Sequence, residues 1–190
     1  AYHSAIGLWA WKRGLAPDQA AELFTPSVMN GLGYAQYWQP SYFELRDQFG
    51  SSSLDFGEFW LRLKRLGVFM HTVNHPRIEA VALLAKSIAV TLGAPSTVWD
   101  EPVERYLQDG LATAVWPVHP PVALALGVDG SDRWRLLHHV YTSVHEFLDA
   151  TWSSYAGTDP ESVFCPRVDD ARYEAVLTQE LRLAMKGVRP

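Results

Sequence analysis

The residues of this chain best suited to chemistry lie together in the segment 69–77, which reads FMHTVNHPR. His71 and His75 carry imidazoles, which gain or lose a proton near neutral pH, and Asn74 between them carries an amide. Side chains of these types suit four arrangements: an acid–base site, an anion-binding loop, a metal site, or a helix start with polar neighbours. The flanking residues decide between them.

An anion-binding loop agrees with those flanking residues. A short apolar run after a glycine predicts a strand near 67–71, and Pro76 fits the first position of a helix, where an N–H is not needed. His75 is then the expected helix cap. The free N–H groups and the dipole of a helix N-terminus attract an anion, and Arg77 can hold a phosphate through two hydrogen bonds.

A metal site fits the segment less well. Zinc-binding H-E-x-x-H motifs place both histidines on one continuous helical face. Here Pro76 directly follows the second histidine, so residues 71–75 are not expected to be helical, and Thr72 stands where that motif has its glutamate. No metal is therefore expected. A purely structural alternative stays open, in which the polar residues before the proline cap a helix and the first histidine hydrogen-bonds a backbone carbonyl.

Two further groups of polar residues are weaker candidates. His3 and Ser4 are adjacent, but adjacency does not create a serine–histidine pair, and no G-x-S-x-G motif occurs in the chain. A capping or solvated role is favoured for them. Trp116 and His119 lie in the segment WPVHPP, where prolines reduce the entropy lost when a loop is ordered. Such a loop can line a pocket or simply pack.

Composition and charge argue against several function classes. The 190 residues carry a net charge of −5 with no basic stripe, so no nucleic-acid partner is expected. No apolar run reaches about 18 residues, so no membrane span is expected. The single cysteine, Cys165, cannot form an internal disulfide, and a cytoplasmic location is the default. Apart from Trp116, the tryptophans suit core or interface positions, which leaves an oligomer open, and they could equally stack on a sugar or an adenine ring.

The apolar pattern predicts the elements that position these candidates. Spacing of three and four residues predicts several helices, the longest over 76–92, 131–155 and 169–186. Thr25 and Asp55 are expected helix caps. The predicted fold class is α/β, predominantly α-helical with few short strands, one of them near 67–71. Because no linker or internal repeat divides the sequence, residues 1–190 are predicted to form a single domain.

Five segments together resemble one protein family, the WcbI family of polysaccharide biosynthesis. In chain order they are YHSAIGLWAWKRGLAPDQAAELF, GLGYAQYW, FMHTVNHPRIEAVALLA, WPVHPPVALALGVDGS and VHEFLDATWSSY. The resemblance covers residues 2–156, and the H-T-V-N-H-P and W-P-V blocks in this order are its most specific parts.

Two departures from the family pattern concern the site. The family begins with a strand and a segment like G-N-C-Q, which this chain lacks, and the chain starts without methionine inside a helix-like pattern. A missing N-terminal portion is therefore expected, which would make this chain the C-terminal portion of a larger α/β fold. The family's loop also reads nearer to W-P-V-Y-P-E, so His119 and Pro121 are substitutions at a place expected to line the pocket.

The resemblance implies transfer of an acetyl group from acetyl-coenzyme A to a sugar hydroxyl of a capsular or exopolysaccharide precursor. Acyl transfer needs a base near the acceptor hydroxyl and donors for the tetrahedral oxyanion. On this basis, His71 or His75 is the expected base and Asn74 is the expected donor. The implied partners are acetyl-coenzyme A and a polysaccharide precursor.

Binding of coenzyme A is expected to involve a second set of residues. Arg77 and the helix N-terminus beside it suit the phosphates. His3, Ser4, Trp116 and His119 are the other expected contacts of coenzyme A in the same pocket.

Two other functions stay open. An esterase or deacetylase would use the same histidines and asparagine on an acylated sugar, and would release acetate without coenzyme A. A non-catalytic helical module would dock on a polysaccharide-assembly complex through its aromatic surface, and would tolerate changes at His71, Asn74 and His75.

Overall fold

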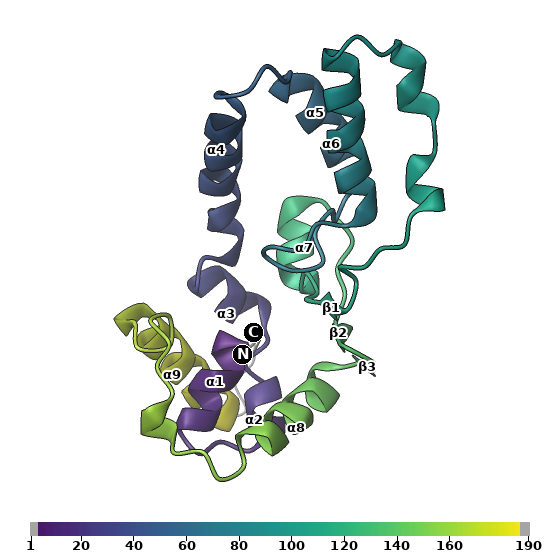
Figure 1. The fold of residues 1–190 in the computed structure, drawn as a ribbon. Coiled ribbons are helices and arrows are strands. Elements are labelled where there is room, and N and C mark those ends of the chain that lie inside the picture. The colour runs from purple at the N-terminus through teal and green to yellow at the C-terminus, as the bar shows by residue number, and fades with distance from the viewer. Residues whose placement is uncertain (1–3, 187–190) are drawn as a thin grey trace. The chain divides into compact units, whose positions relative to one another are not determined.

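The computed structural model of the chain describes residues 4–186. Helices dominate this part of the chain, and it also contains a three-stranded sheet with the strand order β1-β2-β3 (Figure 1). The predicted class, α/β with mostly helical content, is therefore confirmed. Among the described helices, none combines the length and the apolar character needed to cross a membrane.

The chain folds into two compact units, Ala1–Ala35 with Tyr141–Pro190, and Gln36–Val140. We refer to them as the first and the second unit. Two such units can belong to one domain, so the prediction of a single domain stays a prediction.

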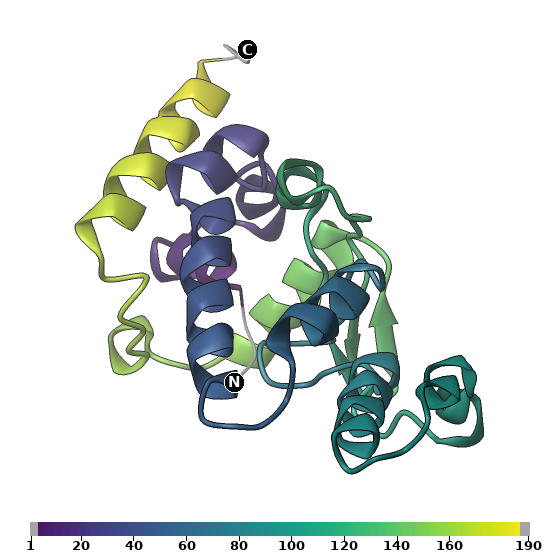
Figure 2. The same ribbon diagram turned by 90° about the horizontal axis from the view of Figure 1, so that it is seen from above.

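The first unit is a group of helices around an apolar core. Its helices are α1 (Ala5–Lys12), α2 (Pro17–Ala21), α3 (Pro26–Gly31), α8 (Val144–Tyr155), the 3-10 helix η4 (Pro160–Ser162) and α9 (Ala171–Met185). Helix α2 packs against α1 and α8, and α3 packs against α9 (Figure 2). Fully buried side chains here include Ile6, Trp9, Leu23, Phe147 and Leu177. The helix predicted over 169–186 is confirmed as α9.

The second unit contains the FMHTVNHPR segment and most of the short elements. Its helices are α4 (Trp38–Phe49), α5 (Phe56–Lys64), α6 (Ile78–Thr91) and α7 (Pro120–Leu126), with the 3-10 helices η2 (Ser96–Asp100) and η3 (Val103–Tyr106). The strands are β1 (Ala114–Val115), β2 (Trp134–Leu136) and β3 (His139–Tyr141), and β1 pairs antiparallel with β2. The short helix η1 (Tyr34–Tyr37) and β3 cross the limits of this unit. Helix α5 packs against α6 around Phe59, Leu63 and Ala80, which fixes the start of α6.

Local capping signals are confirmed at two helix starts. Thr25 precedes α3, and its hydroxyl oxygen accepts a hydrogen bond from the N–H of Val28 at 3.1 Å. Asp55 precedes α5, and its carboxylate accepts from the N–H of Glu58 at 3.0 Å. Both bonds satisfy backbone donors that a helix leaves without partners at its first turn.

Two predicted elements are wrong. The strand expected near 67–71 is reduced to a single antiparallel bridge between Met70 and Pro76, because the chain turns back within five residues. The helix expected over 131–155 is interrupted by β2 and β3, and α8 begins only after Ser143, which caps it. Apolar residues at three- and four-residue spacing continue through both strands, so the pattern alone does not distinguish them from a helix face.

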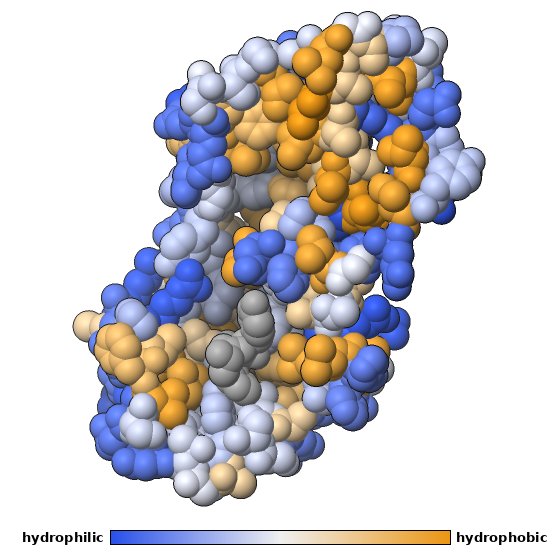
Figure 3. Space-filling view, in the orientation of Figure 1, coloured by the Kyte–Doolittle hydropathy of each residue, from blue (hydrophilic) through white to orange (hydrophobic). Residues whose placement is uncertain are grey.

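Helix α6 confirms the helix predicted over 76–92, but its apolar side chains do not all face inward. Val81, Leu84, Ile88 and Leu92 are exposed. Figure 3 shows apolar side chains gathered on the surface over α5 and α6. Lys86 is buried instead, with Nζ 3.4 Å from the carbonyl oxygen of Trp99. The only lysine of α6 is therefore directed inward, and the exposed stripe of Val81, Leu84, Ile88 and Leu92 is uncharged.

Candidate functional site

The FMHTVNHPR segment forms a narrow loop that leads into α6. The N–H of His71 donates to the carbonyl oxygen of His75 at 2.7 Å, and the N–H of Arg77 donates to that of Phe69 at 2.9 Å. These bonds place the two histidines on opposite arms of the loop. The tip is exposed, and Val73 there retains 94% of its surface.

His71 is paired with a carboxylate far away in the sequence. Its Nε2 lies 2.7 Å from Oδ2 of Asp109. The same carboxylate accepts the N–H of Ile78, the first residue of α6, at 3.2 Å, and the N–H of Leu111 at 3.2 Å. Asp109 therefore joins the histidine, the start of a helix and its own turn through one side chain. The His71 side chain is only 13% exposed, so the pair is largely shielded from water.

These contacts determine the protonation of Asp109. Burial raises its pKa, but the hydrogen bonds from His71 and from the N–H groups of Ile78 and Leu111 outweigh this effect and leave the pKa below the usual value. Asp109 is therefore ionised at neutral pH. A carboxylate held against one imidazole nitrogen fixes the ring and its tautomer.

The start of α6 differs from the expected anion-binding site. The helix begins at Ile78 with Arg77 as its cap residue, so the prediction that His75 caps it is wrong. Its first N–H already has a negative partner, the carboxylate of Asp109. The guanidinium of Arg77 donates to the carbonyl oxygen of Val68 at 2.9 Å. The Arg77 side chain is 40% exposed, so a phosphate in solution could reach it. Phosphate binding by Arg77 therefore stays a prediction.

Asn74 and His75 occupy different environments on the same loop. Asn74 is exposed at the tip, where its Oδ1 accepts a hydrogen bond from the hydroxyl of Thr72 at 3.0 Å. Nδ1 of His75 is buried and has no hydrogen-bond partner among the described residues. Because a buried nitrogen cannot take a proton from a substrate, Nδ1 is not available as a base, and a role of His75 as base through its other nitrogen stays a prediction.

An apolar pocket of about 330 Å³ opens beside His71, within the second unit. Its lining includes Trp38, Phe69, Met70, His71, Trp116 and Val118. The N–H of Trp116 donates to the carbonyl oxygen of His71 at 2.6 Å, which attaches the WPVHPP loop to the histidine. The structure therefore brings together two of the predicted site residues, His71 and Trp116.

The remaining predicted residues lie elsewhere. His119 does not line this pocket, and its Nδ1 lies 3.4 Å from Oδ1 of Asp132. Burial lowers the pKa of His119 and outweighs the opposing effect of Asp132. Ser4 lies in the first unit, where its hydroxyl oxygen accepts the N–H of Gly7 at 3.4 Å and caps α1. His3 lies outside the described residues.

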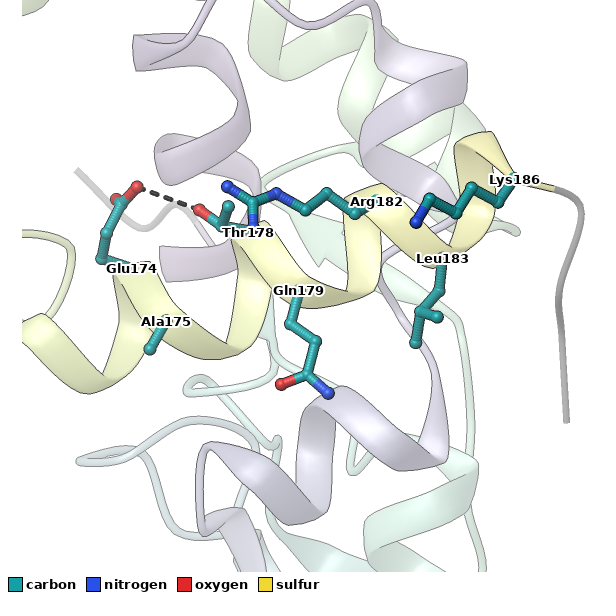
Figure 4. Close-up of a pocket in the computed structure, with 7 residues that line it drawn as sticks. All are labelled: Glu174, Ala175, Thr178, Gln179, Arg182, Leu183 and Lys186. Atoms are coloured by element: carbon teal, nitrogen blue, oxygen red, sulfur yellow. Dashed lines mark hydrogen bonds between the residues drawn. The ribbon is translucent and has the colours of Figure 1, made fainter.

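Another pocket lies in the first unit along α9 (Figure 4). Its lining consists of one face of a single helix, and Oε1 of Glu174 accepts a hydrogen bond from Thr178 there at 3.0 Å. It contains none of the predicted site residues and no histidine. We therefore assign the candidate site to the pocket beside His71.

Asp109 is the functional residue that sequence reasoning missed. The dipeptide Asp109–Gly110 is a turn signal, so the sequence offered a local role for the aspartate. Nothing in the sequence indicated a partner 38 positions away. Trp38 also lines the pocket, and the sequence does not distinguish it from the other tryptophans that suit either a core position or a stack with a ligand ring.

Comparison with known families gives one assignment. The family model for the polysaccharide biosynthesis enzyme WcbI matches residues 1–97, just over half of the chain. This range includes the FMHTVNHPR segment and ends before Asp109 and Trp116. No curated protein and no solved structure matches the chain.

Proposed function

Because the chain belongs to the WcbI family of polysaccharide biosynthesis enzymes, we propose that it transfers an acyl group, with acetyl as the smallest, from a coenzyme A thioester to a sugar hydroxyl of a polysaccharide precursor. The observation that carries this proposal is the pairing of His71 with Asp109 at the edge of a pocket. An imidazole oriented by a carboxylate is the arrangement in which histidine serves as a general base.

The transfer follows from the orientation of His71. With Nε2–H donated to Asp109, the lone pair on Nδ1 takes the proton of the acceptor hydroxyl as its oxygen bonds to the thioester carbonyl carbon. The carbon–sulfur bond of the tetrahedral intermediate then breaks, and Nδ1–H returns the proton to the leaving sulfur. The products are a sugar ester and free coenzyme A thiol. Ionised Asp109 stabilises the imidazolium that exists between the two steps.

The oxyanion and the coenzyme A phosphates need donors as well. Asn74 lies next to the lining residue Val73, and because its Oδ1 already accepts a hydrogen bond from Thr72, its amide N–H groups are the proposed oxyanion donors. The side chain of Arg77, which is 40% exposed and lies 3.4 Å from the carboxylate of Glu79, is the proposed contact for a phosphate. Trp116 lines the same pocket and is proposed to contact the thioester end of coenzyme A.

The test combines binding with catalysis. Coenzyme A and acetyl-coenzyme A are titrated by calorimetry, and thiol release from acetyl-coenzyme A is measured with a panel of nucleotide sugars as acceptors. We expect the unmodified protein to release thiol. His71→Asn should lower the rate of this release by about 100- to 10,000-fold, the usual contribution of a general base.

The matched control is His138→Asn, which replaces an exposed histidine of the same unit. It should react at the rate of the unmodified protein. Acetate release from acetylated sugars without coenzyme A would assign an esterase instead. Equal rates for His71→Asn and His138→Asn would contradict the proposed base.

A further inference from the structure

We infer that the pocket beside His71 binds an aliphatic acyl chain of about six to ten carbons, so that the donor thioester carries a longer group than acetyl. This inference rests on the proposed acyl transfer and names the class of its donor substrate. Three properties of the pocket carry it: the chemistry of its lining, its size and its position relative to the base.

The lining of the pocket offers very little hydrogen bonding. Its side chains are almost all apolar or aromatic, among them Trp38, Phe69, Met70, Val118, Leu126 and Val128. The polar side-chain groups are few: the imidazole of His71, the hydroxyl of Thr72 and the indole N–H groups of the two tryptophans. Nε2 of His71 is bonded to Asp109, and the hydroxyl of Thr72 is bonded to Asn74. A ligand that fills this pocket must therefore be largely apolar.

This lining disfavours the other parts of the two substrates. A sugar ring carries several hydroxyls, and the pantetheine arm of coenzyme A carries two amides. Burying such groups without hydrogen-bond partners is unfavourable. An alkyl chain has no such requirement and gains free energy with each methylene that leaves water.

The pocket is too large for an acetyl group to fill it. An apolar cavity of about 150 Å³ accommodates benzene, with its six carbons. The pocket beside His71 measures about 330 Å³, roughly twice that volume. A two-carbon group would leave most of this apolar space without contacts, whereas a medium-length chain would fill it.

The position of His71 indicates which chain enters. The base acts at the bond between the acceptor oxygen and the thioester carbonyl, and the acyl chain is attached directly to that carbonyl carbon. A lipid attached to the acceptor would be separated from the reacting hydroxyl by the sugar itself. His71 lies in the lining of the pocket, so the apolar space begins where the acyl chain begins.

The experiment measures binding of coenzyme A thioesters with acyl chains of two to ten carbons, and of free octanoate, by calorimetry. Val118→Phe and Val128→Phe each place a larger side chain in the lining. Val81→Phe is the control, because Val81 is an exposed valine of α6 in the same unit. Far-UV circular dichroism checks that each variant folds. If only one of the two phenylalanine variants of the lining folds, that variant alone is enough for the test.

We expect the affinity to rise by about fourfold per added methylene, converted from about 0.8 kcal/mol per buried methylene. Both filled-pocket variants should lose this dependence on chain length and still bind acetyl-coenzyme A, while Val81→Phe keeps it. Octanoyl-coenzyme A that binds no better than acetyl-coenzyme A would overturn the inference and leave the proposed function intact. Octanoate that binds and is lost in Val118→Phe, with no affinity for coenzyme A, would support the chain site and overturn the proposed function.

Discussion

Replacing Asp109 by asparagine tests the structure of the site most directly. The carboxylate accepts three hydrogen bonds, from His71 and from the N–H groups of Ile78 and Leu111. An amide keeps one acceptor oxygen but loses the charge. Because a hydrogen bond to a charged group contributes about 1.5–3 kcal/mol, Asp109→Asn should lower the free energy of unfolding by about that amount at pH 7.

The loss should depend on pH in a defined direction. Hydrogen bonds hold the pKa of Asp109 below its usual value in the folded state. The stabilisation is therefore fully present above the unfolded pKa of about 3.9, and it is lost as the pH falls through the folded pKa. The difference between the unmodified protein and Asp109→Asn should shrink below about pH 4, where the carboxylate in the unmodified protein also becomes neutral.

The assay is urea unfolding followed by circular dichroism between pH 3 and pH 7. Asp129→Asn is the control, since Asp129 is an exposed aspartate of the same unit. The amide at position 109 should also present an N–H to Nε2 of His71 and reverse the tautomer of the ring, so acyl transfer should fall by at least tenfold. Equal stability of Asp109→Asn and Asp129→Asn at every pH would refute the hydrogen-bonded pair.

Two other predictions concern packing and a second histidine. A Cβ at Gly130 would lie 2.6 Å from the backbone Cα of Pro120, so Gly130→Ala should lower the free energy of unfolding by about 1–3 kcal/mol in a urea titration. A Cβ at Gly110 meets open space, so the control Gly110→Ala should change the free energy of unfolding by less than about 0.5 kcal/mol. Burial lowers the pKa of His119 against the effect of Asp132, so the unfolded state takes up its proton first and stability should fall as the pH drops below about 6.5. His119→Gln should flatten this pH dependence of the unfolding free energy, and an unchanged slope would contradict the buried neutral imidazole.

Local signals in the sequence determined much of the helical framework. The helices predicted over 76–92 and 169–186 are present as α6 and α9, and the caps Thr25 and Asp55 make the expected bonds. Each of these features depends on residues within a few positions of one another. The helix predicted over 131–155 failed because β2 and β3 form by pairing across a turn and with β1, and apolar spacing alone does not reveal such pairing.

The same distinction applies to the candidate site. The sequence by itself identified the segment that carries His71, because histidines and an asparagine beside a proline are visible without any fold. Only the tertiary structure decided that Asp109, and not an outside anion, meets the first N–H of α6, and that Trp38 and Trp116 line one pocket with His71. These contacts join residues tens of positions apart. Packing of the second unit creates them, since no local pattern of residue types specifies which distant side chain will fill a given hydrogen bond.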